Sequence, residues 1–504
     1  MTNSTQNKIQ KLPTGISGFD AISNGGIPKG RTTLLAGTAG SSKTVFAVQY
    51  LACGIRMNDE HCVFVTFEET PEDIRQNMLS FGWDVAEWEK QGKWRFVDVS
   101  PKPEEAYILS GSYDLAALIA RIEHAIVETD ATRVSIDSLG AIFSKFDDRH
   151  MVRSELLRIS VNLKKLGVTA LMTAERSEEY GDIARHGIEE FVADNVIILR
   201  NVLEAESRRR TMEILKFRGT DHQKGEHPFS IIAEGGIVGV PLSTVQLDHR
   251  SSHVRITSGT ERLDGMCGGG FFRDSIVLIS GATGTGKTLM ATSFIAGAGE
   301  DEKSLFFAFE ESRDQLFRNA DGWGVDFKKM EAEGRLKVVC AYPEVTGLEE
   351  HLIQMKRAIE EFNPSRIAVD SLSALERSSS TKSFREFVIG ITSFIKQKEI
   401  VGVFTSVTPS LMGGTSVTEA HISTITDSIV LLRYVELFGE ISRGIAVLKM
   451  RGSIHEKEIR EYTIGNTGME VGKPFRNITG ILTGNPQYHQ TPEADRLAEM
   501  FDDV

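Results

Sequence analysis

A phosphate-binding loop occurs twice in this chain of 504 residues, and its surroundings are duplicated with it. The first copy spans residues 37–44 (GTAGSSKT) and the second spans residues 281–288 (GATGTGKT). The lysines of the two loops lie 244 positions apart, and the same separation maps the glycine pair 25–26 onto the pair 269–270. A single loop match is a modest signal, but two in register within a long repeat predict two tandem nucleotide-binding domains.

Length and composition fit this prediction. The chain can form two domains of about 250 residues each, and 40% hydrophobic with 25% charged residues is typical of globular proteins. The net charge of -13 disfavours non-specific binding to nucleic acid or to anionic membranes. The cysteines, none spaced as metal ligands, predict buried thiols in a reducing compartment; they are Cys53, Cys62, Cys267 and Cys340. With neither a signal peptide nor a membrane helix in the sequence, we expect a cytoplasmic protein.

Each half alternates short hydrophobic runs with helical patterns. Residues 32–36 and 275–280 are β-prone runs that lead into the two loops, and residues 62–66 and 134–137 are further apolar runs. Parallel strands joined by crossover helices satisfy such a pattern, so we predict an α/β fold with mostly parallel sheets flanked by helices. We place the first domain at residues 1–247, the second at 248–480 and a C-terminal tail at 481–504.

The loop residues predict how phosphate is held. Backbone N–H groups of such a loop face the phosphate oxygens, and the following helix adds its positive end. We expect Lys43 and Lys287 to neutralise the β- and γ-phosphates, and the hydroxyls of Thr44 and Thr288 to hold Mg²⁺. Ser42 stands where the other copy keeps a glycine. If phosphate must approach closely there, serine lowers the affinity of the first site; if only helical dihedral angles are needed, serine is tolerated.

Paired acids follow an apolar run in each half, namely Glu68–Glu69 and Glu310–Glu311. A carboxylate in this place can orient or deprotonate an attacking nucleophile, while its neighbour tunes it or helps to hold the metal. Alternatively, the acids simply begin a helix, since residues 70–73 read as a helix N-terminus. The pairs recur 242 positions apart, which favours catalysis.

Asp137 and Asp370 end apolar runs and are each followed by serine. We expect them to be the second metal-associated acids, which reach Mg²⁺ through water. A helix-capping role is the weaker alternative, because the preceding residues are hydrophobic in both copies. A constant offset maps Asp137 onto Asp370, and we call it the aspartate register. From these aspartates onward it aligns the two halves without a gap and maps Asp194 onto Asp427.

The aspartate register pairs the segment 216–219 (KFRG) with 449–452 (KMRG). A Lys-x-Arg pair far from its own loop suits a finger inserted into the γ-phosphate site of a neighbouring subunit, and a surface charge pair is an equally good alternative. The register also pairs Glu190–Phe191 with Ser423–Thr424. The second half alone has adjacent hydroxyls here, which are either ordinary strand or turn residues or phosphoacceptors.

Taken together, the doubled FEE segments, the KxRG segments and the HISTITD segment at 421–427 closely resemble the KaiC family within the RecA-like superfamily. The resemblance extends from about Pro13 to Gly480. It implies two tandem RecA-like P-loop domains and a homohexamer of two stacked rings with ATP between adjacent subunits. It further implies slow ATP hydrolysis in the first ring, and reversible phosphate transfer to serine and threonine in the second. This is the activity of the circadian clock ATPase and autokinase.

The resemblance also implies residue roles. Glu68 and Glu310 are the expected bases, supported by Glu69 and Glu311; Ser423 and Thr424 are the expected phosphoacceptors, with Thr418 nearby, and Arg385 is expected near the second γ-phosphate. The nucleotide-binding residues that it implies in the first half are Gly40, Ser41, Ser42, Lys43, Thr44, Ser80, Asp137, Lys216, Phe217, Arg218, Thr220 and His222. Those that it implies in the second half are Thr283, Gly284, Thr285, Gly286, Lys287, Thr288, Leu289, Trp323, Asp370, Arg443, Lys449, Met450, Arg451, Ser453, His455 and Lys457. The implied metal-associated residues are Thr44, Thr288 and Glu310.

Partners follow from the same resemblance. The family implies ATP and Mg²⁺ as cofactors, a KaiB-like protein docked on the first ring, and the activator KaiA recruited by the C-terminal segment. Here that segment is short, acidic and poorly matched, which argues against dependence on a KaiA-like activator. A homologue in a reduced timer, or a signalling switch outside a full clock, would fit this departure.

Two other classes of protein share parts of this pattern. A RecA-like nucleic-acid motor would have the same loops and acids, with Arg208–Arg210 as a contact, but the net negative charge and the lack of a basic and aromatic tract argue against it. A scaffold that nucleotide merely holds together would not need the paired acids or the phosphoacceptor positions.

Overall fold

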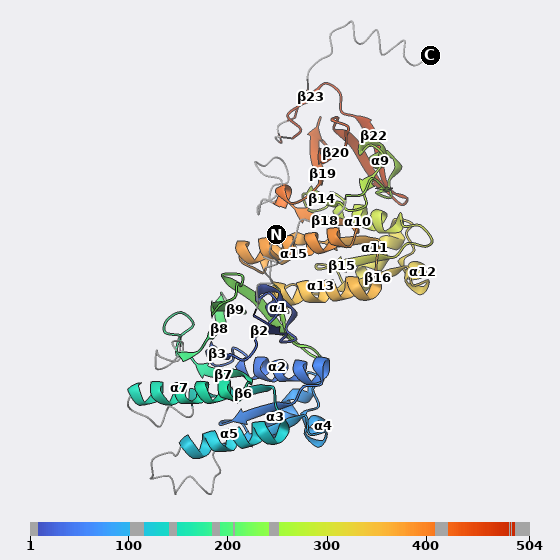
Figure 1. Ribbon diagram of the computed structural model, residues 1–504. Coiled ribbons are helices and arrows are strands. Elements are labelled where there is room, and N and C mark those ends of the chain that lie inside the picture. Colours follow the sequence, from blue (N-terminus) through green and yellow to red (C-terminus); the bar gives the residue numbers. More distant parts are fainter. Residues whose placement is uncertain are drawn as a thin grey trace, which may run out of the picture. The chain divides into compact units, whose positions relative to one another are not determined.

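The computed structural model describes residues 9–100, 115–140, 149–183, 192–204, 207–240, 251–408, 422–482, 484 and 486–488. The chain divides into two compact units, Met1–Thr244 and Val245–Val504 (Figure 1). Residues 241–250, Thr418 and nearly all of the tail predicted at 481–504 lie outside the described residues.

The first unit is built on a mostly parallel sheet. Within its described residues, nine strands run in the order β11-β10-β9-β8-β3-β7-β6-β4-β5, of which the run from β8 to β5 is parallel and β9 to β11 are antiparallel. The strands are β3 (Thr32–Gly37), β4 (Cys62–Thr66), β5 (Trp94–Asp98), β6 (Arg133–Asp137), β7 (Thr169–Glu175), β8 (Asn195–Glu204), β9 (Ser207–Phe217), β10 (Glu226–Ile232) and β11 (Gly236–Gly239), with a separate pair β1 (Lys11–Leu12) and β2 (Ile27–Pro28).

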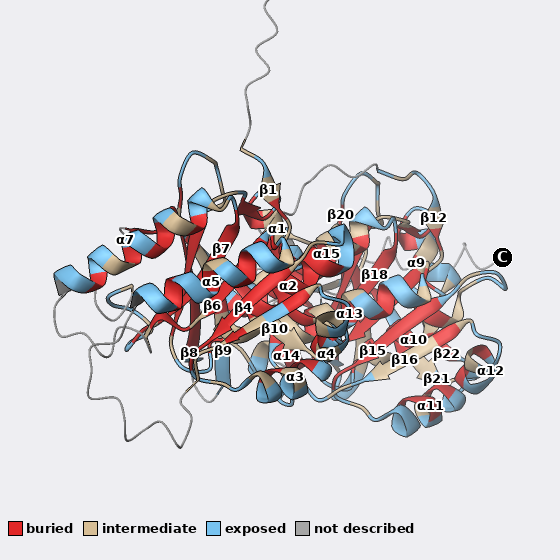
Figure 2. Ribbon diagram, turned by 60° about the horizontal axis from the view of Figure 1, so that its bottom comes forward, coloured by how far each residue is buried: buried red, intermediate tan, exposed pale blue. Residues whose placement is uncertain are grey.

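Helices cover both faces of this sheet. One core packs the sheet against α1 to α4, and a second core packs it against α5 and α7, whose outer sides are exposed and inner sides buried (Figure 2). The helices are α1 (Ser17–Ile22), α2 (Lys43–Asn58), α3 (Pro71–Leu79), α4 (Val85–Lys90), α5 (Leu115–Thr129) and α7 (Arg149–Lys165). Strands β3 and β4 are buried along their whole length, as expected of strands covered on both faces.

The second unit repeats this plan. Among its described residues, nine strands run in the order β16-β15-β17-β18-β14-β19-β20-β21-β22, parallel from β16 to β19 and antiparallel beyond. The strands are β14 (Ile276–Gly281), β15 (Ser304–Ala308), β16 (Leu336–Cys340), β17 (Arg366–Asp370), β18 (Val401–Val407), β19 (Ser428–Leu437), β20 (Glu440–Met450), β21 (Arg460–Gly465) and β22 (Gly468–Pro474), with the pairs β12 (Arg255–Ile256) and β13 (Phe271–Phe272), and β23 (Ile478–Thr479) and β24 (Gln487–Tyr488). The helices are α9 (Glu261–Met266), α10 (Lys287–Ala296), α11 (Arg313–Gly322), α12 (Phe327–Ala332), α13 (Leu348–Phe362), α14 (Leu372–Arg377) and α15 (Thr381–Gln397), and a 3₁₀ turn, η2, spans Ile422–Thr424. The predicted fold class, two tandem α/β units with mostly parallel sheets flanked by helices, is confirmed.

The prediction that the aspartate register runs without a gap is wrong over part of the chain. That register maps Arg133 onto Arg366 and Thr169 onto Gly402. In the sheets, however, Arg133 pairs with Thr169, whereas Arg366 pairs with Val401, so β7 and β18 are offset by one position from the aspartate register. The aspartate register returns at the starts of β8 and β19. The one-residue difference falls in connecting segments, where insertions cost least.

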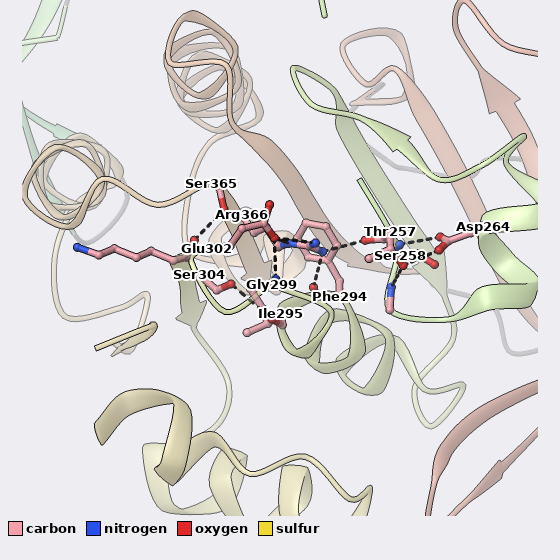
Figure 3. Close-up of polar contacts among 12 residues, drawn as sticks. Thr257, Ser258, Asp264, Phe294, Ile295, Gly299, Glu302, Ser304, Ser365 and Arg366 are labelled. Carbon is pink, nitrogen blue, oxygen red and sulfur yellow. Dashed lines mark hydrogen bonds and ion pairs between the residues drawn. The ribbon is translucent and has the colours of Figure 1, made fainter. Parts of the chain in front are cut away.

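A buried arginine ties each unit together at the start of a central strand. Arg366, only 3% exposed, pairs with Glu302 at 3.0 Å and donates to the carbonyls of Thr257 and Phe294 at 2.8 and 3.1 Å (Figure 3). It thereby joins β17, α10 and the segment after β12. Arg133 makes the matching contacts in the first unit, to Glu60 and to the carbonyls of Pro13 and Tyr50.

The prediction of buried thiols holds for three cysteines and is wrong for the fourth. Cys53, Cys62 and Cys267 are buried, whereas Cys340 is exposed because it ends β16, the edge strand of its sheet. None of the helices in the described part of the chain is long and apolar enough to cross a membrane.

Candidate functional site

The first phosphate loop connects β3 to α2, with α2 beginning at Lys43. Gly40 and Ser42 both adopt left-handed backbone angles, with φ of 73° and 75°. The Lys43 ammonium donates to the carbonyls of Gly37 and Thr38 at 3.0 and 2.9 Å. Burial lowers the pKa of Lys43, an effect opposed by four carboxylates, the first of which is Glu175. The lysine is thus folded back onto its own loop.

The second loop connects β14 to α10 in the same way. Gly284 and Gly286 have φ of 81° and 93°, and the Lys287 ammonium donates to the carbonyl of Ala282 at 2.9 Å. Burial lowers the pKa of Lys287, opposed by the nearby charges of Asp370 and Glu310. A half-buried ammonium in the first loop and a buried one in the second donate to loop carbonyls, on loops that lead into a helix N-terminus. This arrangement fits the binding of a polyphosphate.

A threonine and an aspartate meet behind each loop. Thr44 Oγ1 donates to Asp137 Oδ2 at 2.7 Å, and Thr288 Oγ1 donates to Asp370 Oδ2 at 2.6 Å. The other oxygen of Asp137 accepts from Thr173 at 2.5 Å. A hydroxyl and a carboxylate side by side next to a phosphate site are hard oxygen ligands that fit Mg²⁺, which keeps several waters and few protein ligands.

The proposed bases stand beside these aspartates. The Ser138 hydroxyl donates to Glu68 Oε1 at 2.8 Å, and the Ser371 hydroxyl donates to Glu310 Oε2 at 3.1 Å. The backbone connects them too, since Phe67 N donates to Asp137 O at 2.9 Å. Each unit therefore has one contiguous cluster of side chains. It consists of the loop threonine, the strand-end aspartate, the serine after that aspartate and the first acid of the FEE pair.

The second acid of each pair has a different environment. Glu69 accepts from Asn77 Nδ2 at 3.3 Å, and Glu311 accepts from Asn319 Nδ2 at 3.2 Å. Burial, followed by the charge of the neighbouring aspartate, raises the pKa of both carboxyls. The helix N-terminus read at residues 70–73 is also present, because Thr70 caps α3. The acids therefore precede a capped helix and also stand at the phosphate site.

Ser80 and Trp323 occupy matching places, each just after the helix that follows the FEE pair. The Ser80 carbonyl accepts from Glu234 N at 3.2 Å, in the turn between β10 and β11. Trp323 is half-buried against the core of the second unit. The β21–β22 hairpin reaches the second loop, since a side-chain carbon on Gly286 would lie 2.9 Å from Ile464 Cδ1.

In each unit, the Lys-x-Arg pair lies at one end of the parallel strands, and its own phosphate loop lies at the other end. Lys216 Nζ donates to Ala193 O at 2.9 Å, and Arg218 pairs with Asp194 at 3.6 Å. Asp194 accepts from Thr32 N at 3.2 Å, at the start of β3, whereas the loop follows the end of β3. Six strand residues span roughly 20 Å, so this pair cannot reach the phosphate site of its own unit.

In the second unit, the segment with the predicted phosphoacceptors lies at the end of the strands that carries the Lys-x-Arg pair. Lys449 Nζ donates to Thr426 O at 2.6 Å, and Arg451 Nη2 donates to Thr424 O at 2.8 Å. Thr424 is exposed at the end of η2. The side chain of Ser423 lies outside the described residues. The acceptor segment and the Lys-x-Arg pair therefore form one group, away from their own phosphate loop.

The remaining predicted residues lie in several different places. Leu289 and Met450 are buried in the core, and Phe217 packs with His222 at a ring distance of 5.6 Å. Arg385 is exposed on α15, and no hydrogen bond or ion pair among the described residues joins it to the second loop. Polar residues just beyond the Lys-x-Arg pairs are Thr220, Ser453, His455 and Lys457. Arg443 instead lies opposite Tyr434, 5.8 Å from its ring, at the end of β20 near the second loop.

Four features of the site were not predicted. Thr173 and Thr405 hold the strand-end aspartates, Arg377 pairs with Glu310, and Glu179 contacts the first loop. Single threonines within a strand, and single charged residues in a connection or at a helix end, carry no sequence signal of their own. Only the fold brings them to the site.

Two of the three arginines offered as a nucleic-acid contact are engaged within the first unit. Arg208 donates to Asn201 O at 2.8 Å, and Arg209 pairs with Glu204 at 3.9 Å. These contacts leave little reason to expect a phosphate-backbone surface on β9.

Comparison with known proteins decides the family. The KaiC ATPase family model matches residues 12–243 and again residues 256–475. The chain belongs to the KaiC family of ATPases. It is 65% identical over 496 residues to the circadian clock protein KaiC3 of Synechocystis sp., covering 98% of both chains. It is 54% identical to the circadian clock oscillator protein KaiC of Thermostichus vulcanus over 500 residues, and to that of Synechococcus elongatus over 499 residues, covering 99% of this chain and 96% of each relative. The KaiC resemblance inferred from the sequence is thus confirmed.

Proposed function

We propose that this chain is an ATP-driven clock protein that works as a homohexamer, with an ATPase in the first unit and a reversible serine/threonine autokinase in the second. The names of its KaiC relatives support the clock role. The matched clusters of loop, aspartate and glutamate in both units support two nucleotide sites. One observation supports a kinase in the second unit and an ATPase in the first: Thr424 lies beside Arg451, at the end of the strands opposite to its own phosphate loop.

Phosphate transfer between subunits follows from that position. An acceptor roughly 20 Å from the phosphate loop of its own unit can only meet a nucleotide held by a neighbour. ATP supplies the γ-phosphoryl group, and bound Mg²⁺ neutralises charge on its phosphates. Lys287 and the loop N–H groups hold the phosphates, while Lys449 and Arg451 arrive with the acceptor from the adjacent subunit.

Glu310 then acts on the acceptor hydroxyl. Its carboxylate takes the proton as the acceptor oxygen bonds to phosphorus and the bond between phosphorus and the bridging oxygen of ADP breaks. In the first unit the residue that aligns with Thr424 is Phe191. Without an acceptor hydroxyl, Glu68 is left to act on water, which gives hydrolysis.

The partners and the location are part of the same proposal. We expect a KaiB-like protein to bind the first unit, and no requirement for a KaiA-like activator. Three buried cysteines without a disulfide fit a reducing compartment, so we place the protein in the cytoplasm.

Mass spectrometry of the chain after incubation with Mg²⁺ and ATP tests the autokinase. Phosphate on the peptide with Ser423 and Thr424 is expected, and it should be absent from the Ser423→Ala, Thr424→Ala double variant. Undiminished labelling of that variant would refute the acceptor assignment. The Glu68→Gln, Glu310→Gln variant should assemble but turn over no ATP; a pure scaffold would show no turnover in the parent protein either.

A mixing experiment tests transfer between subunits. Chains with Glu310→Gln retain the acceptors but lack the base, and chains with Ser423→Ala and Thr424→Ala retain the base but lack the acceptors. Neither should be labelled alone, whereas hexamers assembled from both should carry phosphate on the Glu310→Gln chains. Labelling of Glu310→Gln chains alone would contradict the role of Glu310.

A further inference from the structure

The first phosphate loop is held from outside by a carboxylate. Thr38, the second residue of the loop, donates from Oγ1 to Glu179 Oε1 at 2.6 Å, and the other oxygen of Glu179 accepts from Asn201 N at 3.0 Å. The carbonyl of Thr38 accepts from Lys43 Nζ at 2.9 Å. An unbroken chain of contacts therefore runs from Glu179 through Thr38 to the loop lysine.

Two buried arginines shape the segment that delivers Glu179. Arg176, 6% exposed, donates to the carbonyls of Gly181 and Asp182, both at 3.1 Å. Arg200, 7% exposed, donates to the carbonyl of Glu179 at 3.3 Å and pairs with Glu213 on β9 at 2.7 Å. Because both arginines are buried and bonded to carbonyls of the segment, its conformation is fixed from within the unit.

The second loop is held by different chemistry. It has Ala282 where the first has Thr38, so the hydroxyl is missing. Tyr434 Oη instead donates to Thr283 O at 3.3 Å, and Tyr462 Oη donates to Thr285 O at 2.5 Å. In the aspartate register the first unit has an asparagine and a phenylalanine in place of these tyrosines, Asn201 and Phe229, neither of which has a phenol.

The first loop has a particular need for such a contact. Ser42 has φ of 75°, a left-handed conformation that costs a side-chain-bearing residue roughly 1–2 kcal/mol. The matching residue in the second loop is a glycine, which adopts this conformation freely. A strained backbone persists only where its surroundings hold it in place.

We propose that Glu179 is a positioning residue of the first nucleotide site: through Thr38 it holds the phosphate loop in its binding conformation, as Tyr434 and Tyr462 hold the second loop. This inference rests on the proposed function of the first unit as an ATP site. It also gives the first site a negative charge close to the loop lysine, among the carboxylates around Lys43. The hydrogen bond from Thr38 to Glu179 favours ATP binding, whereas the negative charge of Glu179 disfavours it. Thr38 is therefore the better residue to change, because its substitution removes the bond and leaves the charge.

Steady-state ATP hydrolysis by the full chain in a Glu310→Gln background reports on the first site alone. Thr38→Ala should raise the KM for ATP about five- to ten-fold, with a smaller change in kcat, because the bond to a charged acceptor is lost. Thr38→Ser, which keeps the hydroxyl, should restore the parent KM. Glu179→Ala added to Thr38→Ala should change KM by less than about two-fold further, because the two residues act through one bond.

Glu178→Ala is the matched control, since Glu178 is an exposed neighbour on the same segment. It should leave KM unchanged. An unchanged KM in Thr38→Ala, or a failure of Thr38→Ser to restore it, would overturn the inference. If the background variant hydrolyses no ATP, the proposed ATPase fails. Binding of a fluorescent ATP analogue then decides the inference, because weaker first-site binding in Thr38→Ala is still expected and equal binding would refute it.

Discussion

Arg377 donates from Nη2 to Oε1 of Glu310 at 2.7 Å, while the Ser371 hydroxyl bonds to the other oxygen of the same carboxylate at 3.1 Å. Both oxygens of the proposed second-unit base are therefore engaged. In the first half the matching connection, residues 141–148, lies outside the described residues. Among the described residues, an arginine pairs with the base proposed for phosphate transfer, and none pairs with the base proposed for hydrolysis.

We predict that Arg377→Gln raises ATP consumption at the second site, because it frees Oε1 of Glu310 to orient the nucleophile. The pair is largely exposed, with 62% and 40% of the two side chains accessible, so the gain should be small, about two- to five-fold. Hydrolysis and phosphate incorporation in a Glu68→Gln background measure it. Arg377→Lys, which keeps a cation, should remain near the parent rate.

Arg313→Gln is a suitable control for that variant, since Arg313 is also an exposed arginine but pairs with Glu331 on α12 and not with the base. It should change neither rate. A fall in second-site turnover with Arg377→Gln would mean that the arginine orients Glu310 and does not restrain it.

The left-handed conformation of Ser42 should lower the stability of the first unit. Ser42→Gly should stabilise the first unit by about 0.5–1 kcal/mol, since relief of the left-handed strain is partly offset by the greater freedom of glycine in the unfolded chain. Thermal unfolding of the nucleotide-free protein measures this effect.

The reciprocal change, Gly286→Ser, should destabilise the second unit by about 1–2 kcal/mol. Gly286 has φ of 93°, and an added side-chain carbon would lie 2.9 Å from Ile464 Cδ1. Equal stability of Gly286→Ser and the parent would show that the loop accepts a side chain without strain.

The buried arginines should be among the most sensitive positions for folding. Arg366→Leu leaves Glu302 without its cation, and the carbonyls of Thr257 and Phe294 without a donor, so it should cost about 3–5 kcal/mol. Arg357→Leu is the control, because Arg357 makes an exposed pair with Glu361 and should change stability by less than about 0.5 kcal/mol. Urea unfolding of both variants compares them; similar losses would mean that the buried network adds little.

Much of the fold followed from the sequence because the signals were local and repeated. The hydrophobic run at 62–66 became β4 with the bounds expected, and the runs before the two loops became β3 and β14. Fully apolar runs between helical patterns have few solutions besides a buried parallel sheet. The one-residue slip across β7 and β18 was not predictable, because it starts and ends in connections, where the sequence carries little constraint.

The site was predicted less completely, for a physical reason. Motif residues such as Lys43 and Asp137 are recognisable because their chemistry fixes their spacing. Glu179 and Tyr434 reach the loops from distant segments, and nothing in their local sequence marks them. Contacts of that kind depend on the packing of the whole sheet, so only the three-dimensional structure reveals them.

The second acids of the FEE pairs carry a stability cost that depends on pH. Burial, followed by the charge of Asp370, raises the pKa of Glu311 above its ordinary value of 4.5. The folded chain therefore binds this proton more tightly than the unfolded chain. As the pH rises from about 4.5 through the raised pKa, the free energy of unfolding falls, and the loss persists at neutral pH.

Glu311→Gln should therefore be more stable than the parent at pH 7, because glutamine cannot ionise and still offers an oxygen to Asn319. The advantage should vanish below about pH 4.5, where the parent carboxyl is protonated in both states. Chemical denaturation between pH 4 and about pH 8 measures the difference. Glu361 gives the opposite sign, because a hydrogen bond from Arg357 lowers the pKa of this exposed carboxyl. Glu361→Gln should lose a little stability at neutral pH, whereas a stability gain in both variants would point to a general effect of removing negative charge from a chain of net charge -13.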